Sequence, residues 1–287
     1  MISEDGRPGT TVETAIASYD GRAVQQRFDR LATEEPLEIR MRAGTQTRTV
    51  AITMRTPGAD FELAAGFLFD EGVLASLGEL RGITYCVDRD VAEEQRYNIV
   101  NVDLHGSALP PLDALERHFT MTSACGVCGK ANIEALRDRG LVPVRSGLRI
   151  DAALIAALPD RLFAAQRVFA TTGGLHAAAL FDARGELVAI REDVGRHNAL
   201  DKLVGWALMN GKLPLDEHIV LFSGRASYEL LQKAISAGIA VVCSVSAPSS
   251  LAVDLAREFG VTLAGFLRGA RFNVYAGAER IAFPEPG

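Results

Sequence analysis

Residues 219–267 read IVLFSGRASYELLQKAISAGIAVVCSVSAPSSLAVDLAREFGVTLAGFL, and their pattern decides the fold. Three short apolar runs, at 219–222, 239–245 and 261–267, alternate with two segments whose apolar residues have helical spacing. Short apolar runs bounded by turn residues are typical of buried strands, and the segments between them are long enough for crossover helices. The stretch therefore predicts parallel strands covered by helices.

The chain just upstream extends this pattern. Residues 200–208 carry the apolar stripe of a helix, and residues 176–191, HAAALFDARGELVAIR, are typical of a hairpin. We predict an α/β fold for residues 131–287, with a mixed sheet covered by helices, and its order resembles the cytidine deaminase architecture. A zinc deaminase also needs H-x-E and PCxxC at its helix starts. The helix starts here read GRHNALDK and SGRASYEL, which argues against deamination.

The first half has a different organisation. Alternating apolar residues from Pro36 to Met54 predict a hairpin, a helix follows over residues 60–71, and further strands are expected near 83–87 and 97–104. We predict a smaller N-terminal α+β domain over residues 21–121, and a loop over 122–130 that leads into the larger domain. The polar, glycine-containing start, residues 1–20, is predicted to be a disordered tail.

Composition limits the function classes. The chain has 287 residues, a net charge of -6 and a pI near 5.5. An acidic chain does not favour wrapping nucleic acid. The start shows no secretory signal pattern, and no apolar run reaches the roughly 20 residues that span a bilayer. We expect a cytoplasmic protein with neither a nucleic-acid nor a membrane partner.

The segment TSACGVCGK at 122–130 holds a CxxC pair, Cys125 and Cys128. The following residues are predicted to form a short helix, whose positive end, together with Lys130, should lower the pKa of a thiol there and favour the nucleophilic thiolate. Such a thiolate can accept sulfur as a persulfide. Cys86 and Cys243 lie in apolar runs and are expected to be core residues.

Three other interpretations of the pair remain open. A structural zinc site needs four ligands, and Cys86 and Cys243 are isolated from each other, so no zinc is expected. A thioredoxin-like centre usually opens a helix directly after a strand, which this context does not resemble. A buried, inert pair is disfavoured by the two glycines and the polar neighbours.

Basic residues at helix starts and in one turn form a candidate anion site. Backbone N–H groups at helix starts favour phosphate, and guanidinium groups bind it bidentately. Helix caps and solvated arginines are the alternative at the helix starts, and a charged β-turn is the alternative in the turn. Gly173, Gly174 and His176 permit either a ligand or a hydrogen-bonded core histidine. The candidate cofactor-binding residues are Arg196, His197, Arg225, Phe266, Leu267, Arg268, Gly269, Ala270 and Arg271; Asn198, Ser223 and Gly224 lie among them.

Six segments in order resemble the formate dehydrogenase accessory sulfurtransferase (FdhD) family, from about Pro36 to the C-terminal region. They read TPGADFELAAGFLFDEG, TSACGVCGK, TTGGLHAAAL, REDVGRHNALDK, FSGRASYEL and GFLRGAR. The resemblance implies a cytidine deaminase-like larger domain.

It also implies a sulfurtransferase that accepts sulfur from a cysteine desulfurase. Cys125 would carry the persulfide, and Cys128 would be the second cysteine of the motif. The sulfur would pass to the molybdenum bis(molybdopterin guanine dinucleotide) cofactor, bound as substrate by Phe266 to Arg271, for formate dehydrogenase. A ligand of that size suits a two-fold interface, so we expect a homodimer. A non-covalent cofactor chaperone and a zinc-stabilised binding protein are the alternatives.

Overall fold

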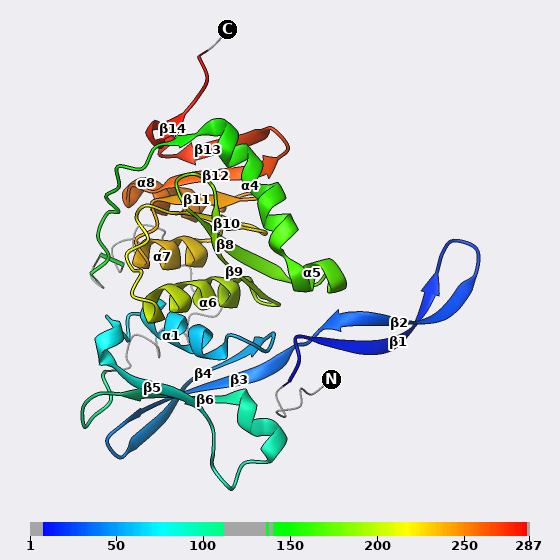
Figure 1. Cartoon of the computed structure of the whole chain (residues 1–287). Helices are drawn as coiled ribbons and strands as arrows, with labels where there is room; N and C mark the ends of the chain where they lie inside the picture. Colours follow the sequence, from blue (N-terminus) through cyan, green and yellow to red (C-terminus); the bar gives the residue numbers. More distant parts are fainter. Residues whose placement is uncertain (1–7, 112–135, 138–139, 286–287) are drawn as a thin grey trace.

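The computed structural model describes residues 8–111, 136–137 and 140–285. Its larger sheet has six strands in the order β13-β12-β11-β10-β8-β9 (Figure 1). Strands β10, β11 and β12 are parallel, whereas β8, β9 and β13 pair antiparallel to their neighbours. The predicted mixed α/β fold is thus confirmed. The strands are β8 (His176–Phe181), β9 (Leu187–Asp193), β10 (Ile219–Phe222), β11 (Val241–Ser244), β12 (Thr262–Arg268) and β13 (Arg271–Ala276).

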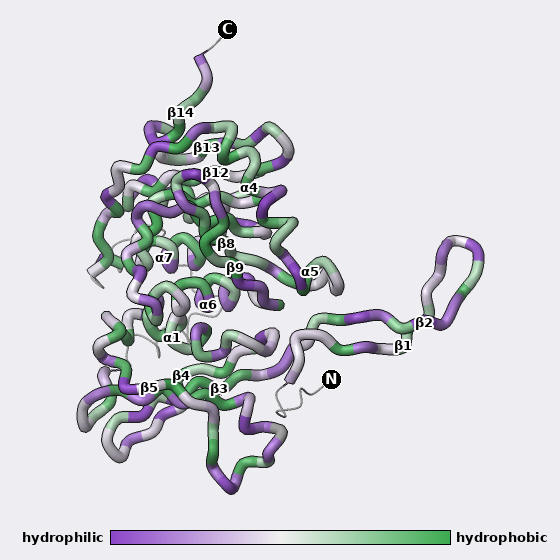
Figure 2. Tube along the Cα trace, in the orientation of Figure 1, coloured by the Kyte–Doolittle hydropathy of each residue, from purple (hydrophilic) through white to green (hydrophobic). Residues whose placement is uncertain are grey.

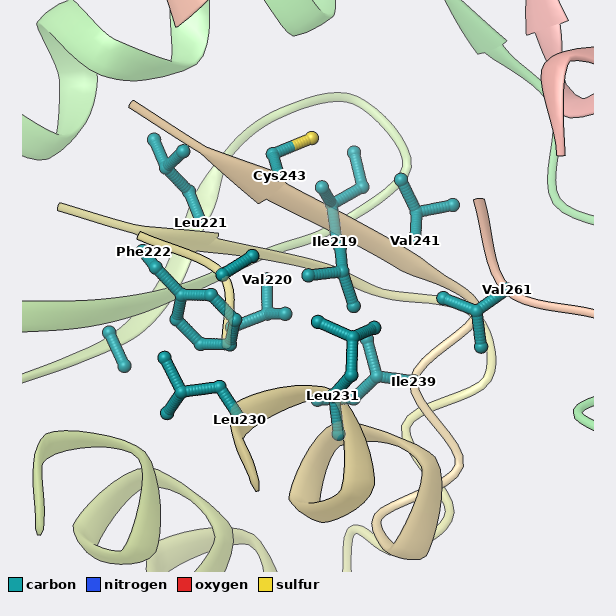
Figure 3. Packing of buried hydrophobic residues seen from close by; sticks show 14 of the residues in the cluster. Ile219, Val220, Leu221, Phe222, Leu230, Leu231, Ile239, Val241, Cys243 and Val261 are labelled. Carbon is teal, nitrogen blue, oxygen red and sulfur yellow. The ribbon is translucent and has the colours of Figure 1, made fainter. Parts of the chain in front are cut away.

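Helices cover this sheet and bury its central strands. All four residues of β10 and of β11 are buried, as expected for parallel strands packed on both faces. In Figure 3, Val220 and Phe222 point toward Leu230 and Leu231, whereas Leu221 and Cys243 point the other way. Figure 2 shows the same concentration of hydrophobic residues around β8. The helices of this part are α4 (Ala152–Ala165), α5 (Arg167–Thr172), α6 (Arg196–Met209), α7 (Tyr228–Ser236) and α8 (Ser250–Glu258), with a short pair β7 (Ile150–Asp151) and β14 (Ile281–Ala282).

A second hydrophobic cluster lies in the N-terminal part. Its sheet has the order β4-β3-β6-β5, and the apolar face of α1 packs on it. The predicted hairpin, helix and two later strands are all present, although residues 93–98 form a 3-10 helix before the last strand begins. The elements are β3 (Glu35–Ala43), β4 (Gln46–Arg55), α1 (Asp60–Asp70), β5 (Leu80–Tyr85) and β6 (Ile99–Leu104).

The start of the chain corrects one prediction. We expected residues 1–20 to be a disordered tail, but β1 (Thr11–Tyr19) pairs antiparallel with β2 (Val24–Ala32) over nine residues. The β1–β2 arm extends away from the rest of the chain in Figure 1. Asp20 makes its turn, because its carboxylate accepts from the backbone N–H groups of Arg22 and Ala23. The Asx turn and the alternating side chains favour a hairpin more strongly than the polar composition favours disorder.

The two parts meet where α1 crosses α6. A β-carbon at Gly66 would overlap the backbone carbonyl of Asp201 and lie 2.7 Å from the backbone nitrogen of Gly205. A β-carbon at Gly205 would in turn overlap the carbonyl of Glu62. Helices approach this closely only where both lack a side chain at the crossing. The two glycines therefore fix the distance between the small sheet and the helix that carries Arg196 and His197.

Candidate functional site at the carboxyl edge of the sheet

One edge of the large sheet collects most of the predicted site residues. Parallel strands β10, β11 and β12 end there, and antiparallel β8 begins there with His176. Ser223, just after β10, donates its backbone N–H to the carbonyl of Ala177 at 3.0 Å, and Val245 donates to Phe222 at 3.0 Å. We call these strand ends, with the start of α6, the carboxyl edge. Open α/β sheets bind ligands at this edge.

The β12–β13 turn carries Phe266 to Arg271 to this edge. Phe266 has a φ of 56°, which bulky residues rarely adopt, and its side chain is 39% exposed. Its backbone N–H donates to the carbonyl of Ser246 at 3.1 Å, and the strand register shifts between Gly265 and Arg268. This bulge turns the phenyl ring outward, and Arg268, Gly269 and Ala270 are exposed beside it. Backbone strain of this kind is often stored at ligand sites.

Leu267 differs from its neighbours in the turn. It is 1% exposed and belongs to the main hydrophobic cluster. Its side chain therefore stabilises the hairpin, and only its backbone could meet a ligand.

Arg196 and His197 form the first turn of α6. Arg196 Nε and His197 Nε2 are buried atoms without a hydrogen-bond partner among the described residues. His197 Nε2 lies 3.8 Å from Glu229 Oε2, and the imidazole together with nearby backbone and Ser227 groups lowers the pKa of Glu229 to about 2, against the effect of burial. Arg225, between β10 and α7, is exposed to solvent. The carboxyl edge thus holds two guanidinium groups and an imidazole that faces a carboxylate.

His176 has features of both interpretations that the sequence allowed, a ligand contact and a core histidine. It is partly buried at the start of β8, and a β-carbon at Gly224 would come 3.3 Å from its Nδ1. Burial lowers the pKa of His176, and the charges of Arg196 and His197 lower it further. This environment therefore favours the neutral form of the His176 imidazole.

Asn198 serves a different role from the anion contact that the sequence suggested. Its Nδ2 donates to the carbonyl of Met54 at 2.7 Å and to Asp193 at 3.0 Å. Asp193 also accepts from the backbone N–H groups of Thr56 and Gly195, and its other contact is Lys202 Nζ at 2.7 Å. The fully buried Asp193 therefore ties the loop before α6 to the N-terminal part.

A second buried charge cluster stabilises the same junction. Lys233 Nζ lies 2.7 Å from Asp201, 3.6 Å from Glu71 and 4.0 Å from Asp70. Sequence reasoning missed Asp193, Lys202 and Lys233 because charged residues are usually exposed. The signal that could have found them is the placement of charges inside otherwise apolar helical stripes.

Two of the four cysteines lie among the described residues, and both are buried as the sequence predicted. Cys86 and Cys243 are free and buried, which confirms them as core residues. Burial raises the pKa of Cys243 to about 12, so its thiol stays protonated. Cys125 and Cys128 lie outside the described residues.

The described part of the chain holds neither a metal-ligand cluster nor a membrane-spanning helix. Within residues 8–111, 136–137 and 140–285, no three His, Cys, Asp or Glu side chains gather closely enough to hold a metal ion. Over the same ranges, no helix has the length and apolarity needed to cross a membrane.

The fold and the carboxyl edge define an α/β protein with two hydrophobic clusters and basic side chains at one edge of its larger sheet. A sequence model of the FdhD/NarQ family matches residues 32–282, and the chain belongs to this family. It is 58% identical over 269 residues to the sulfur carrier protein FdhD of Streptomyces avermitilis, covering 93% of this chain and 94% of that one. The Mycobacterium tuberculosis protein of the same name is 49% identical over 275 residues, covering 94% and 98%.

A solved structure supports the fold. It is a protein from Desulfotalea psychrophila described as a formate dehydrogenase accessory protein, with a TM-score of 0.73 and 24% identity. The match covers 95% of this chain and 100% of that chain. The family model and the relatives described above, and not this structure, confirm the family resemblance seen in the sequence.

Proposed function

We propose that this protein is a sulfur carrier in the maturation of formate dehydrogenase. The names of its relatives carry this proposal, since chains 58% and 49% identical to it over most of its length are sulfur carrier proteins. The Desulfotalea protein of the same fold is described as a formate dehydrogenase accessory protein. The partners are then a cysteine desulfurase as sulfur donor and the catalytic subunit of formate dehydrogenase.

Cys125 is the proposed sulfur-bearing residue. Its thiolate attacks the outer sulfur of the donor's cysteine persulfide, the donor's S–S bond breaks, and the donor cysteine leaves as a thiolate. No net oxidation occurs, because one persulfide replaces another. The two other cysteines are unsuited to this step, since Cys86 and Cys243 are buried in the cores.

Cys128 is the residue proposed to release the sulfur from Cys125. Its thiolate attacks the inner sulfur of the Cys125 persulfide, the outer sulfur departs as sulfide, and a Cys125–Cys128 disulfide forms. A dithiol reductant then restores both thiols. The two electrons that reduce sulfane sulfur to sulfide come from the cysteine pair, so the molybdenum centre that receives the sulfide keeps its oxidation state.

The carboxyl edge is the proposed cofactor surface. Molybdenum bis(molybdopterin guanine dinucleotide) is a large polyanion and the substrate of the transfer. Arg196, His197 and Arg225 at the helix starts, with Arg268 and Arg271 in the turn, would bind its phosphates. The exposed ring of Phe266 would stack on one of its planar rings.

Sulfur loading tests this function. The protein is incubated with cysteine desulfurase and cysteine, and its mass is measured together with cyanide-releasable sulfur. We expect a gain of about 32 mass units per sulfur atom in the wild type and none in Cys125→Ala. Cys243→Ala is the matched control and should still load. A wild type that never gains sulfur would contradict the proposal.

The non-covalent chaperone is the second candidate, favoured by the cationic carboxyl edge alone. It predicts that Cys125→Ala, Cys128→Ala protein still supports formate dehydrogenase maturation, whereas the sulfur carrier predicts loss of that activity.

The homodimer stays a prediction, and sedimentation equilibrium of the purified protein measures it.

A further inference from the structure

The outer edge of β4 borders a cavity where the two parts of the chain meet. Among the described strands, β4 stands at one end of the order β4-β3-β6-β5, so one of its sides has no strand beside it. Residues 51–54 of β4 line a cavity of about 520 Å³, and the starts of α6 and α7 form its opposite wall. We call this cavity the junction groove. Its volume is within the range of ligand pockets, so it can hold a long side chain of a partner.

The backbone of Ile52 points to the open side of β4. In an antiparallel pair, residues alternate between those whose N–H and C=O face the neighbouring strand and those that face away. Met54 lies opposite Pro36, which has no N–H, and its carbonyl accepts from Asn198 Nδ2 at 2.7 Å. Met54 therefore faces away from β3, and Ile52, two residues earlier in the same register, does so too. No described residue outside the sheet bonds to the backbone of Ile52.

The side chains at this edge are apolar and exposed. Ile52 is 66% exposed and Met54 is 47% exposed. Open edges of this kind are templates for another strand, and proteins usually protect them with charges or prolines. Residues 51–54, AITM, contain neither, although the register shift at Val50 limits the open stretch to these residues. The edge thus offers the backbone groups and apolar side chains by which a short extended peptide adds to a sheet.

The junction groove is acidic. Lys233 lies 2.7 Å from Asp201 and 3.6 Å from Glu71, so its charge is already balanced. Glu34 is exposed and forms no ion pair with a described residue, and Glu229, whose pKa is lowered to about 2, is ionised at neutral pH. The charges of the groove therefore favour a cation. Its ionisable lining residues are Glu34, Glu71, Asp201, Glu229, His197 and Lys233.

The rest of the groove is apolar. Ile39, Leu63 and Phe67 line it beside the carboxylates. Lysine and arginine carry a charged head on an apolar stem, so one such side chain would match both the apolar wall and the acidic residues. A basic residue of a partner fits this groove better than a wholly apolar or an acidic one.

We propose that the β4 edge and the junction groove bind an extended segment of the formate dehydrogenase catalytic subunit before that subunit has received its cofactor. The segment would pair with Ile52 as an added strand and place one lysine or arginine in the groove. This inference rests on the proposed function, which supplies the partner. A protein that lacks a large buried cofactor keeps nearby segments poorly ordered, because cofactor binding and folding are coupled, and such segments are free to extend. His197 lines the groove and also belongs to the carboxyl edge, so a subunit docked here lies beside the proposed cofactor surface.

Interferometry with the immobilised full-length protein and the purified catalytic subunit without cofactor tests the docking. Ile52→Pro removes the outward N–H without the loss of a sheet hydrogen bond, and proline is tolerated at such an edge position. We expect this variant to bind the subunit about 10- to 100-fold more weakly than the wild type. Val87→Pro, at an exposed position just after β5, is the matched control and should bind as the wild type does.

Ile52→Lys keeps the test valid if the proline variant fails to fold. It retains the N–H and changes only an exposed side chain, so its urea midpoint should equal that of the wild type. An edge lysine discourages strand addition and repels a basic segment, so binding should weaken about 10-fold.

Glu34→Lys tests the charge of the groove. We expect it to weaken binding about 3- to 10-fold, with a larger effect at low salt. Glu217→Lys, exposed at the amino end of β10, is the control and should bind as the wild type does.

Three results would overturn the proposal: a wild type that does not bind the subunit, undiminished binding by both Ile52 variants, or equal binding of the subunit that already holds its cofactor. A dimer that Ile52→Lys converts into a monomer would also overturn it, because the edge would then belong to a second copy of this chain. Sulfur loading on Cys125 is measured in the same preparations. A protein that loads sulfur but binds the subunit independently of Ile52 refutes the docking site and leaves the sulfur carrier intact. A protein that binds through Ile52 yet never loads sulfur supports the docking site and contradicts the sulfur carrier.

Discussion

Gly66 and Gly205 face each other at the crossing of α1 and α6, and each stands where a β-carbon would collide with the other helix. Neither glycine has a left-handed backbone, so the helix crossing, and not local conformation, requires them. The family segments TPGADFELAAGFLFDEG and REDVGRHNALDK are thus partly structural. They hold the α6 start, with Arg196 and His197, at a fixed place relative to the N-terminal sheet.

Gly205→Ala should strongly destabilise the protein. The added methyl group would overlap the carbonyl of Glu62, so the helices must separate, at a cost of about 3 kcal/mol or more. Gly147→Ala is the control, because no atom lies within 4 Å of its β-carbon position, and it should change stability by less than about 0.5 kcal/mol. Urea unfolding measures both. Equal midpoints would show that the crossing is not closely packed.

Lys233→Met should destabilise the protein by about 3 to 5 kcal/mol, because it leaves buried carboxylates without their cation. Burial raises the pKa of Asp70 well above its usual value, whereas Lys233 lowers it. Without Lys233 that pKa rises further, so folding favours protonated Asp70 and stability falls as pH rises through the higher folded-state pKa. Unfolding free energies measured from about pH 5 to about pH 8 should decline more steeply than in the wild type. Arg81→Met, at an exposed site, should keep the wild-type pH profile.

His176 should make the protein less stable in mild acid. Its pKa is lowered from 6.5 by burial and by Arg196 and His197, so the unfolded chain takes up a proton that the folded chain resists. Stability is therefore complete above about pH 6.5 and is lost as pH falls toward the folded-state pKa. His176→Gln should lose less melting temperature between about pH 7 and about pH 5 than the wild type. His105→Gln, on the surface, should behave as the wild type; identical profiles for all three would exclude this role.

Phe266→Gly should separate stability from ligand binding. Glycine adopts a φ of 56° without strain, so the variant should be as stable as the wild type or more stable by about 1 kcal/mol. GDP affinity should fall, because the exposed ring is lost. Phe283→Gly, another exposed phenylalanine, provides the control and should leave affinity unchanged. A Phe266→Gly variant that binds GDP normally would remove this ring from the proposed cofactor surface.

The central α/β unit could be predicted because its signals are local. Residues 219–267 alternate apolar runs with helical stripes, and the strands and helices appear there as expected. Helix α4 was missed although Asp151 caps it and Ile155, Leu158 and Leu162 have helical spacing. Pro159 inside the helix obscures that pattern, since proline usually ends helices.

The rest of the site depends on distant residues. Arg196, His197, Arg225 and the Phe266 turn could be singled out because helix starts and charged turns have recognisable sequences. Lys233 carries no such pattern, and it becomes notable only where folding places its Nζ beside Asp201, Glu71 and Asp70. The same holds for Asp193, whose role follows from four partners that include Thr56, over a hundred positions away in the chain.

The contacts of Asp193 hold the carboxyl edge in one arrangement before a ligand binds. The loop from Asp193 to Arg196 cannot shift without breaking contacts to Thr56, Asn198 and Lys202 together. The entropy of ordering this loop is lost when the chain folds, so a polyanion arriving later meets donors already in place and spends little of its binding energy on arranging them.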